Sequence, residues 1–364
     1  MLAIPLLAAF AIASGPPPAA SLRQPAPVAL RVDGVVQPDG SLGAGGWIVV
    51  RNGRIESLGG AAPPAGAATF EFPGGIACAG MVDVATSLGA AGQLAEPARA
   101  FTPDVAAADA FEPDHSSFLA AARSGVTTVA LTPSGDNIVG GRLALLRTRD
   151  DHGRGAVLVG PGPLRFTWSD EAFPGDRVPT SRMGALPRLR ELLAQDATKT
   201  AGASLVAVQT PDQIRTALDA FSAAGRSIAL LQPIHPEDAL DLLPGRAQAV
   251  VLGAYDLDTP ERETRLPKLL AERAVPVAFT ANGDGAALRL TAALAVRSGL
   301  DPKAARLALT AVPARLLGAD GDAGTLEAGK RADLVVYGGD PLDLAAKIHL
   351  VLVGGAAVAK KETP

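Results

Sequence analysis

Apolar and polar positions alternate in short segments along the first part of the chain. Residues 28–36, 47–50, 54–58 and 69–72 have this strand-like pattern, and Asn52-Gly53 lies between two of them. Asn-Gly between apolar strands favours a tight hairpin, because both residues readily adopt positive φ. The pattern therefore predicts a small β module ahead of residue 81.

From Met81 onward, continuous apolar runs alternate with amphipathic segments. The predicted strands are 81–85, 126–131, 156–160, 204–208, 227–231, 249–253 and 276–280. The predicted helices are 116–123, 183–195, 212–224, 261–273, 286–297 and 302–310. Apolar strands that alternate with helices are typical of a parallel sheet covered by helices. About seven such units predict an α/β fold with a TIM-like (β/α)8 barrel, complete or lacking a unit.

The strand pattern returns near the C-terminal end, at residues 332–337 and 348–353. Because the two β-rich ends flank the barrel, we expect them to pair into one small β-sandwich domain. The predicted boundaries are 28–80 together with 318–358 for this composite domain, and 81–317 for the barrel.

Composition narrows the classes of partner. The chain has 364 residues, is 48% hydrophobic and carries a net charge of −4. It contains no lysine- and arginine-rich run, which argues against nucleic acid as a partner. The single cysteine, Cys78, cannot form an intrachain disulfide or a thiolate metal cluster. It lies in an apolar stretch, so we expect a buried, inert thiol.

Residues 1–20 resemble a secretory signal peptide followed by the start of a linker. Residues 2–13 are apolar, and Ala11-Ile12-Ala13 resembles a small-residue cleavage site. We therefore expect an exported, periplasmic protein, with a mis-set start codon as the alternative, because no lysine or arginine precedes the apolar run. This run is too short to span a bilayer, and no later segment is long and apolar enough.

Five stretches between residues 46 and 343 carry the most specific signal. They are GWIVVRNGRIESLGG, AGMVDVATSLG, AARSGVTTVALTPSGDNIVGGR, LTAALAVRSGLDPKAARLALTAVPARLLGA and AGTLEAGKRADLVVYGGDPLD. In this order they resemble the amidohydrolase superfamily, most closely its imidazolonepropionase-like members. The resemblance implies a distorted (β/α)8 barrel, a β-sandwich built from both chain ends, and metal-dependent hydrolysis of non-peptide C–N bonds at the barrel mouth.

The resemblance also implies where the metal ligands belong. A His-x-His pair follows the first barrel strand, further histidines lie on middle strands, and an aspartate ends the last strand. Here Ala85 and Ser87 occupy the positions of the pair, and Asn282 occupies that of the aspartate. Asp83 precedes the pair and is not itself an expected ligand. Alanine offers no lone pair, serine is a weak ligand, and an amide cannot transfer a proton near neutral pH.

On the middle strands, the positions of the expected histidine ligands are also held by residues that bind metals poorly. Ala207, Gln209 and Gln232 stand where the resemblance implies histidines. We expect the vacated ligand positions to line a pocket made by Asp83, Ala85, Ser87, Gln209, Gln232 and Asn282. No lysine ends the strand at 204–208, so a carbamylated bridging lysine is not expected.

The remaining candidates for chemistry are few. The chain has four histidines, at 115, 152, 235 and 349, and none has a His-x-His or His-Glu-x-x-His spacing. His235 directly follows a predicted strand, and Asp284 lies two residues beyond Asn282. These two are weak candidates for catalytic residues, and structural roles are the simpler interpretation.

The loops near the predicted mouth contain other polar and aromatic residues. Ser134, Asn137 and Arg142 lie in a Gly-rich stretch and could hydrogen-bond a ligand. The glycines there also suit a simple turn before the next strand. Phe166 and Trp168 lie in a Pro/Gly-rich stretch, where lining of the pocket and ordinary packing are both consistent with the pattern.

Three functions stay open. The first is a catalytically degenerate amidohydrolase-like protein without a cofactor, which binds a small molecule at the mouth or serves as a subunit of a homo-oligomer or beside an active relative. The second is an active hydrolase whose Asp83, His115, His235 and Asp284 gather around a divalent metal such as zinc. The third is a purely structural or ligand-binding exported protein. The first is favoured, because a barrel does not depend on a metal for its folding.

Overall fold

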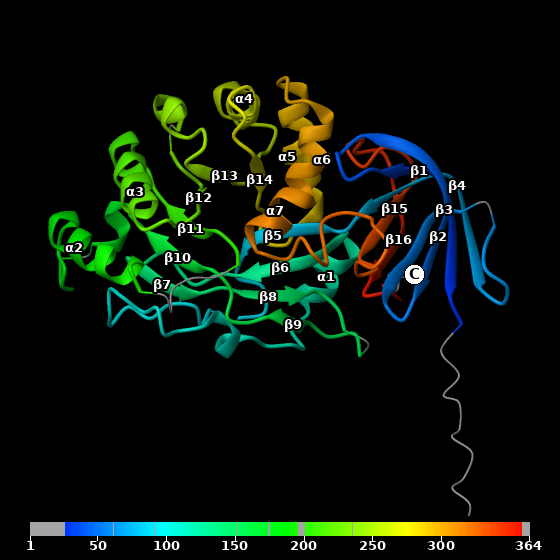
Figure 1. Cartoon of the computed structure of the whole chain (residues 1–364), viewed down its shortest axis with the longest axis horizontal. Helices are drawn as coiled ribbons and strands as arrows, with labels where there is room; N and C mark the ends of the chain where they lie inside the picture. Colours follow the sequence, from blue (N-terminus) through cyan, green and yellow to red (C-terminus); the bar gives the residue numbers. More distant parts are fainter. Residues whose placement is uncertain are drawn as a thin grey trace, which may run out of the picture.

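The computed structural model describes residues 26–60, 62–90, 92–150, 152–173, 175–195, 201–234 and 236–358. The expected signal peptide lies outside these described residues. The chain forms a sheet from both of its ends, beside a larger part in which strands alternate with helices (Figure 1). No helix in the described chain has the length and apolar character needed to cross a membrane.

Both chain ends contribute to one seven-stranded sheet, in the order β17-β16-β15-β4-β1-β2-β3. Its strands are β1 (Val28–Val36), β2 (Leu42–Arg51), β3 (Arg54–Gly60), β4 (Ala68–Ala79), β15 (Leu334–Tyr337), β16 (Ile348–Val353) and β17 (Ala356–Ala357). The two ends meet where β15 pairs antiparallel with β4. The predicted hairpin is present, with φ of 52° at Asn52 and 75° at Gly53. These strands form a single sheet, and the predicted two-sheet sandwich is not seen among them.

The larger part contains two sheets, and the described strands do not close into the TIM-like barrel that the sequence predicts, complete or lacking a unit. One has the order β14-β13-β12-β11-β10-β7, and the other has the order β5-β6-β8-β9. The strands are β5 (Met81–Thr86), β6 (Val126–Leu131), β7 (Val139–Arg142), β8 (Ala144–Arg147), β9 (Ala156–Val159), β10 (Leu164–Thr167), β11 (Ser204–Ala207), β12 (Ile228–Leu231), β13 (Ala247–Leu252) and β14 (Val277–Phe279). Among these strands, no ladder joins β14 to β5. The ring of strands is therefore interrupted.

The predicted helices correspond to the first six α-helices of the structure. The helices are α1 (Ser117–Arg123), α2 (Arg182–Leu193), α3 (Pro211–Ala223), α4 (Glu261–Ala271), α5 (Gly285–Arg297), α6 (Pro302–Leu309) and α7 (Ala311–Leu316). Several begin at a capping side chain: Thr210 forms a capping box with Gln213, and Asp301 accepts two backbone N–H groups before Pro302. Helices α2 to α5 lie along the outer side of the six-stranded sheet (Figure 1).

Residues 139–147 pass from one of these sheets to the other. β7 pairs antiparallel with β10, and β8 pairs antiparallel with β6. The sequence pattern predicts only a Gly-rich turn and a loop here, so β7, β8 and β10 are corrections. β9 lies close to the predicted 156–160, but it pairs antiparallel with β8 and does not extend a parallel barrel.

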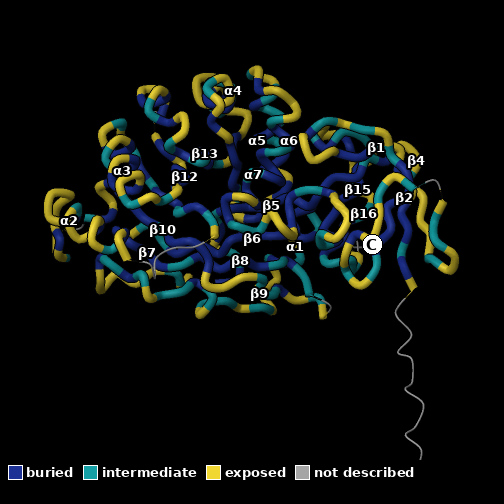
Figure 2. Tube along the Cα trace, in the orientation of Figure 1, coloured by how far each residue is buried: buried dark blue, intermediate teal, exposed yellow. Residues whose placement is uncertain are grey.

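Alternate residues of the parallel strands face opposite ways and form two apolar layers. One cluster includes Val82, Leu205, Leu231 and Val251, and a second, larger cluster packs the other strand faces against the helices. Figure 2 shows the strands of this part as mostly buried and the helices as exposed on their outer sides. The apolar layers support the strand ends that form the candidate site.

Arg306 connects α6 to the seven-stranded sheet through an ion pair and a hydrogen bond. Its side chain is 6% exposed and forms an ion pair of 2.5 Å with Asp340, which follows β15. Its Nη1 donates to the carbonyl of Gly40, in the β1–β2 turn, at 2.9 Å. The contact therefore joins elements from both parts of the molecule.

We expect Arg306→Met to lower the free energy of unfolding by about 2–3 kcal/mol, because a buried carbonyl and a carboxylate lose their donor. Arg297→Met, on the exposed face of α5, removes the same charge and should change stability by less than about 0.5 kcal/mol. Urea denaturation measures both values. Equal changes in the free energy of unfolding for the two substitutions would contradict the role of Arg306 in connecting α6 to the sheet.

Candidate functional site

A cavity of about 480 Å³ opens where the carboxyl ends of the parallel strands come together. Four of the residues predicted to share a pocket line it: Ala85, Ser87, Gln232 and Asn282. The complete lining is Ala85, Thr86, Ser87, Gly92, Leu94, Thr132, Pro133, Ser134, Arg165, Leu231, Gln232, Ala254, Thr280, Ala281 and Asn282. We call this the mouth cavity. Its position follows from the parallel topology, which brings strand ends to one edge.

Asp83 lies beneath the mouth cavity, at the junction of β5 and β14. Its side chain is fully buried. One carboxyl oxygen accepts the backbone N–H groups of Ala281 at 3.0 Å and Gly283 at 2.7 Å, and the other lies 2.5 Å from the Thr280 hydroxyl. Gly283 has a φ of 79°, and a Cβ there would collide with Leu88. Asp83 thus joins the edge strands of two sheets that no ladder connects.

Burial and hydrogen bonding act in opposite directions on the pKa of Asp83. The Thr280 Oγ1 lies within hydrogen-bond distance of both the Asp83 carboxyl, at 2.5 Å, and the Ala85 carbonyl, at 2.8 Å. The hydroxyl of Thr280 donates toward both oxygens and shares its one hydrogen between them. Burial raises the pKa of Asp83 and prevails over the hydrogen bonds from Thr280, Gly283, Ala281 and Ala85, which lower it. No ion pair to Asp83 occurs within the described ranges.

Ser87 and Asn282 hydrogen-bond to each other across the junction of β5 and β14. The amide oxygen of Asn282 accepts the backbone N–H of Ser87 at 2.8 Å and lies 3.2 Å from the Ser87 hydroxyl. Asn282 has a φ of 51°, a left-handed conformation that asparagine tolerates better than most residues. The oxygen at the position of the family aspartate is therefore already engaged by the protein.

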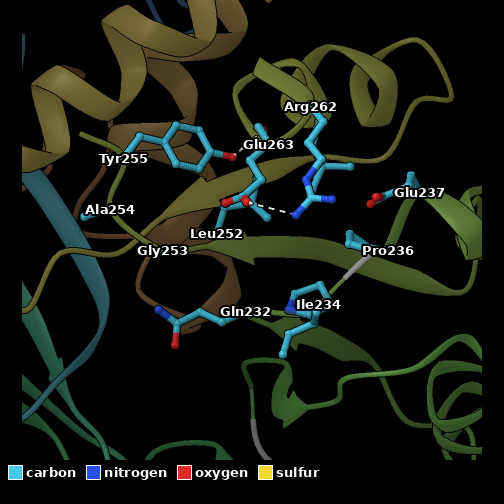
Figure 3. Close-up of a pocket in the computed structure, with 12 residues that line it drawn as sticks. Gln232, Ile234, Pro236, Glu237, Leu252, Gly253, Ala254, Tyr255, Arg262 and Glu263 are labelled. Carbon is cyan, nitrogen blue, oxygen red and sulfur yellow. Dashed lines mark hydrogen bonds and ion pairs between the residues drawn. The ribbon is translucent and has the colours of Figure 1, made fainter. Parts of the chain in front are cut away.

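The two glutamines predicted for the pocket take different places. Gln209 does not line the mouth cavity, and its Nε2 donates to Glu171 at 3.0 Å. Gln232 lines the mouth cavity and also a second cavity of about 290 Å³ at the ends of β12 and β13 (Figure 3). In this second cavity the Arg262 Nη2 lies 3.9 Å from the Glu263 Oε1.

The weak catalytic candidates do not form a described cluster. Asp284 caps α5, since its carboxylate accepts the N–H groups of Ala286 and Ala287. His235 lies outside the described residues. Among the other histidines, His115 lies 2.7 Å from the Ser117 hydroxyl, His152 is exposed, and His349 stacks on Phe72 in the terminal sheet.

The described donors do not fit a divalent metal. In the part of the chain that the structure describes, no three histidine, cysteine, aspartate or glutamate side chains gather in a way that could hold one. The mouth cavity presents an alanine, hydroxyls and amides where imidazole and carboxylate would be needed. Cys78 is buried in the terminal sheet, where burial raises the pKa of its thiol to about 12.

The polar and aromatic loop residues that the sequence suggested as possible pocket residues lie partly at the mouth cavity and partly in the core. Ser134 lines the mouth cavity, whereas Asn137 is buried and donates to the Glu96 carbonyl. Phe166 and Trp168 are in the core, in edge-on contact with Phe221 and Phe173.

Sequence reasoning missed Arg165, which lies between buried neighbours on β10 and lines the mouth cavity. A lone arginine within the apolar stretch PLRFTW was the available signal. Buried arginines need a partner, and that requirement singles out such a residue.

Comparisons with known proteins place the chain beside amidohydrolases. The model of the Amidohydrolase family matches residues 263–358, which run from α4 to the end of the terminal sheet. The structure is similar to an amidohydrolase from Thermotoga maritima MSB8, with a TM-score of 0.78, 21% identity, and coverage of 92% of this chain and 100% of that one. A search of curated proteins finds no match.

Two further solved structures are similar over most of the chain. A prolidase complexed with N-methylphosphonate-L-proline has a TM-score of 0.58 and 16% identity, with 92% of this chain and 100% of that one covered. A molinate hydrolase has a TM-score of 0.54 and 17% identity, with 92% and 95% covered. At these identities the similarity concerns the fold.

The raised pKa of Asp83 predicts a pH dependence of stability. An unfolded aspartate has a pKa near 3.8, so the folded chain binds an extra proton above that pH. Linkage then lowers the contribution of Asp83 to stability as the pH rises from about 4 toward its raised pKa. We expect the free energy of unfolding of the wild type, minus that of Asp83→Asn, to fall over this range in chemical denaturation.

Near neutral pH, Asp83→Asn should cost less than about 1 kcal/mol, because the amide oxygen still accepts from the backbone N–H groups of Ala281 and Gly283. Asp83→Ala is the matched comparison and should cost about 2–4 kcal/mol, since it leaves those groups unpaired. A stability difference that rises with pH would contradict the raised pKa of Asp83, and equal costs of the two variants would contradict its bridging role.

Proposed function

We propose that this protein is a catalytically degenerate member of the amidohydrolase family that binds a small molecule in the mouth cavity. Support comes from the family match over residues 263–358 and from the fold shared with solved amidohydrolases. A cavity of about 480 Å³ is in the range that small-molecule sites occupy. Family membership argues for an ancestral hydrolase site, and the residues of the mouth argue against retained metal chemistry.

The observation that carries the proposal is the pairing of Asn282 with Ser87. In an amidohydrolase, the resemblance puts a proton-transferring aspartate at position 282 and a histidine ligand at position 87. Here the amide oxygen of Asn282 accepts from Ser87, and an amide cannot take up the proton of a nucleophilic water near neutral pH. The two positions stabilise the junction of β5 and β14.

Three finer parts of the proposal rest on the sequence. The imidazolonepropionase-like subtype rests on the five stretches that resemble it. An exported, periplasmic location rests on residues 1–20. Assembly as a homo-oligomer, or beside an active relative, is a prediction that follows from the loss of catalytic groups and has no surface assigned to it.

Metal content tests the proposal. We expect protein purified without a metal-binding tag, incubated with zinc or manganese and then desalted, to retain less than about 0.1 ion per chain by mass spectrometry, because the mouth lacks the needed donors. Its thermal midpoint should be unchanged by a chelator. An ion held at near one per chain, with amide or ester hydrolysis that is lost on chelation, would establish the rebuilt hydrolase instead.

A gain-of-metal variant provides the matched control. Ala85→His combined with Ser87→His restores the His-x-His pair on the wall of the mouth cavity. Two imidazoles on one strand end should raise zinc retention measurably above the wild-type level. This result would show that the assay detects a metal at this position.

A further inference from the structure

Arg165 sets the charge of the mouth cavity. Among the described residues that line it, Arg165 alone carries a formal charge, and no aspartate, glutamate or histidine is among them. A metal centre requires the opposite, since a cation is held by carboxylates and neutral imidazoles. The mouth cavity is therefore suited to an anion.

The guanidinium of Arg165 is only partly satisfied. Its Nη1 donates to the Pro133 carbonyl at 2.8 Å. Its Nε is buried without a hydrogen-bond partner, and its Nη2 has no acceptor among the described residues. An arginine stays charged in proteins, so the N–H groups of Nη1 and Nη2 beyond the bond to Pro133 are left for a ligand, while the buried Nε is not.

The nearest carboxylates do not neutralise this charge by direct contact. Burial lowers the pKa of Arg165, and the charges of Asp136 and Glu171 partly oppose that effect. Each of these acids is engaged elsewhere: Asp136 accepts the Ser134 hydroxyl at 2.6 Å, and Glu171 accepts the Gln209 amide at 3.0 Å. Within the described chain, neither lies within ion-pair distance of Arg165.

The rest of the lining supplies further donors and an apolar wall. The amide oxygen of Asn282 is occupied by Ser87, so its Nδ2 is the group left to donate. Leu94, Leu231 and Ala254 add apolar surface. A ligand that matches this wall has a negative head and an apolar body.

We propose that the mouth cavity binds a small carboxylate with an apolar body, its two oxygens paired with the fork of Arg165. This assignment rests on the proposed ligand-binding function and specifies the class of ligand. A carboxylate accepts two parallel N–H bonds from a guanidinium, which is the strongest pairing available to this side chain.

Titration of the whole protein with benzoate and with benzamide tests the assignment. The two probes share a ring and differ in charge, so a preference measures recognition of the anion. We expect the wild type to bind benzoate at least about tenfold more tightly than benzamide, by calorimetry or ligand-observed NMR. Hexanoate and hexanamide serve as a second pair with a flexible body.

Substitutions locate the preference. Arg165→Met should remove it, Arg165→Lys should retain part of it, and Arg297→Met, which removes an exposed charge on α5, should leave it unchanged. Circular dichroism and the thermal midpoint establish that each variant is folded. The preference of the wild type needs no variant, so it tests the assignment even if Arg165→Met does not fold.

The possible failures are distinguishable. Equal binding of acid and amide, or no binding of either pair at millimolar concentration, would overturn the carboxylate assignment. So would a preference that survives Arg165→Met. None of these results would be evidence for a metal site in the mouth cavity. Metal-dependent hydrolysis in the metal-content assay would instead overturn the proposed function itself.

Discussion

The carboxyl group of Asp83 holds together two edge strands that no backbone ladder joins. β5 ends one sheet and β14 ends the other, and the interior apolar layer spans both. Without the Asp83 carboxyl as acceptor, the N–H groups of Ala281 and Gly283 would be left unpaired where β14 turns toward α5. On the far side the chain itself bridges the two sheets, through residues 139–147. The geometry of the mouth therefore depends on one buried acid.

This junction determines what the mouth can bind. Ser87 and Asn282 hydrogen-bond to each other at the same junction of β5 and β14. The backbone N–H of Ser87 donates to the amide oxygen of Asn282, which is then not free for a ligand. Asp83 is not among the residues that line the cavity, and the described wall contributes the positive charge of Arg165. In a metal-dependent hydrolase the same edge would need several lone pairs directed at one point. The described residues provide an anion-selective wall in place of such a centre.

Much of the fold could be predicted from periodicity, because apolar strands and capped helices carry local signals. Val28–Val36 and Val126–Leu131 have the predicted bounds, and Pro302 begins α6 as expected. The missed strands are short, and β7 contains two glycines, so local pattern alone favours a turn there. Their identity as strands comes from pairing with other segments of the chain, which the local pattern of a single sequence does not reveal.

In the candidate site, too, some residues could be predicted from the sequence and others depend on tertiary contacts. Ala85, Ser87 and Asn282 were placed together by the resemblance to amidohydrolases, whereas Gln209, on a weakly matched middle strand, turns to Glu171 instead. Arg165 gave only a faint signal, because the burial of a charge depends on tertiary packing. The hydrogen bonds of Asp83 span some 200 residues of sequence and are equally invisible to local pattern.

The most direct test of this account is anomalous X-ray diffraction from crystals grown with an excess of zinc, recorded at the zinc absorption edge. The account predicts no anomalous peak in the mouth cavity, with Asn282 still paired to Ser87 and Asp83 still bridging β5 and β14. A strong peak bonded to Asp83 or Asn282, with that pairing broken, would contradict it.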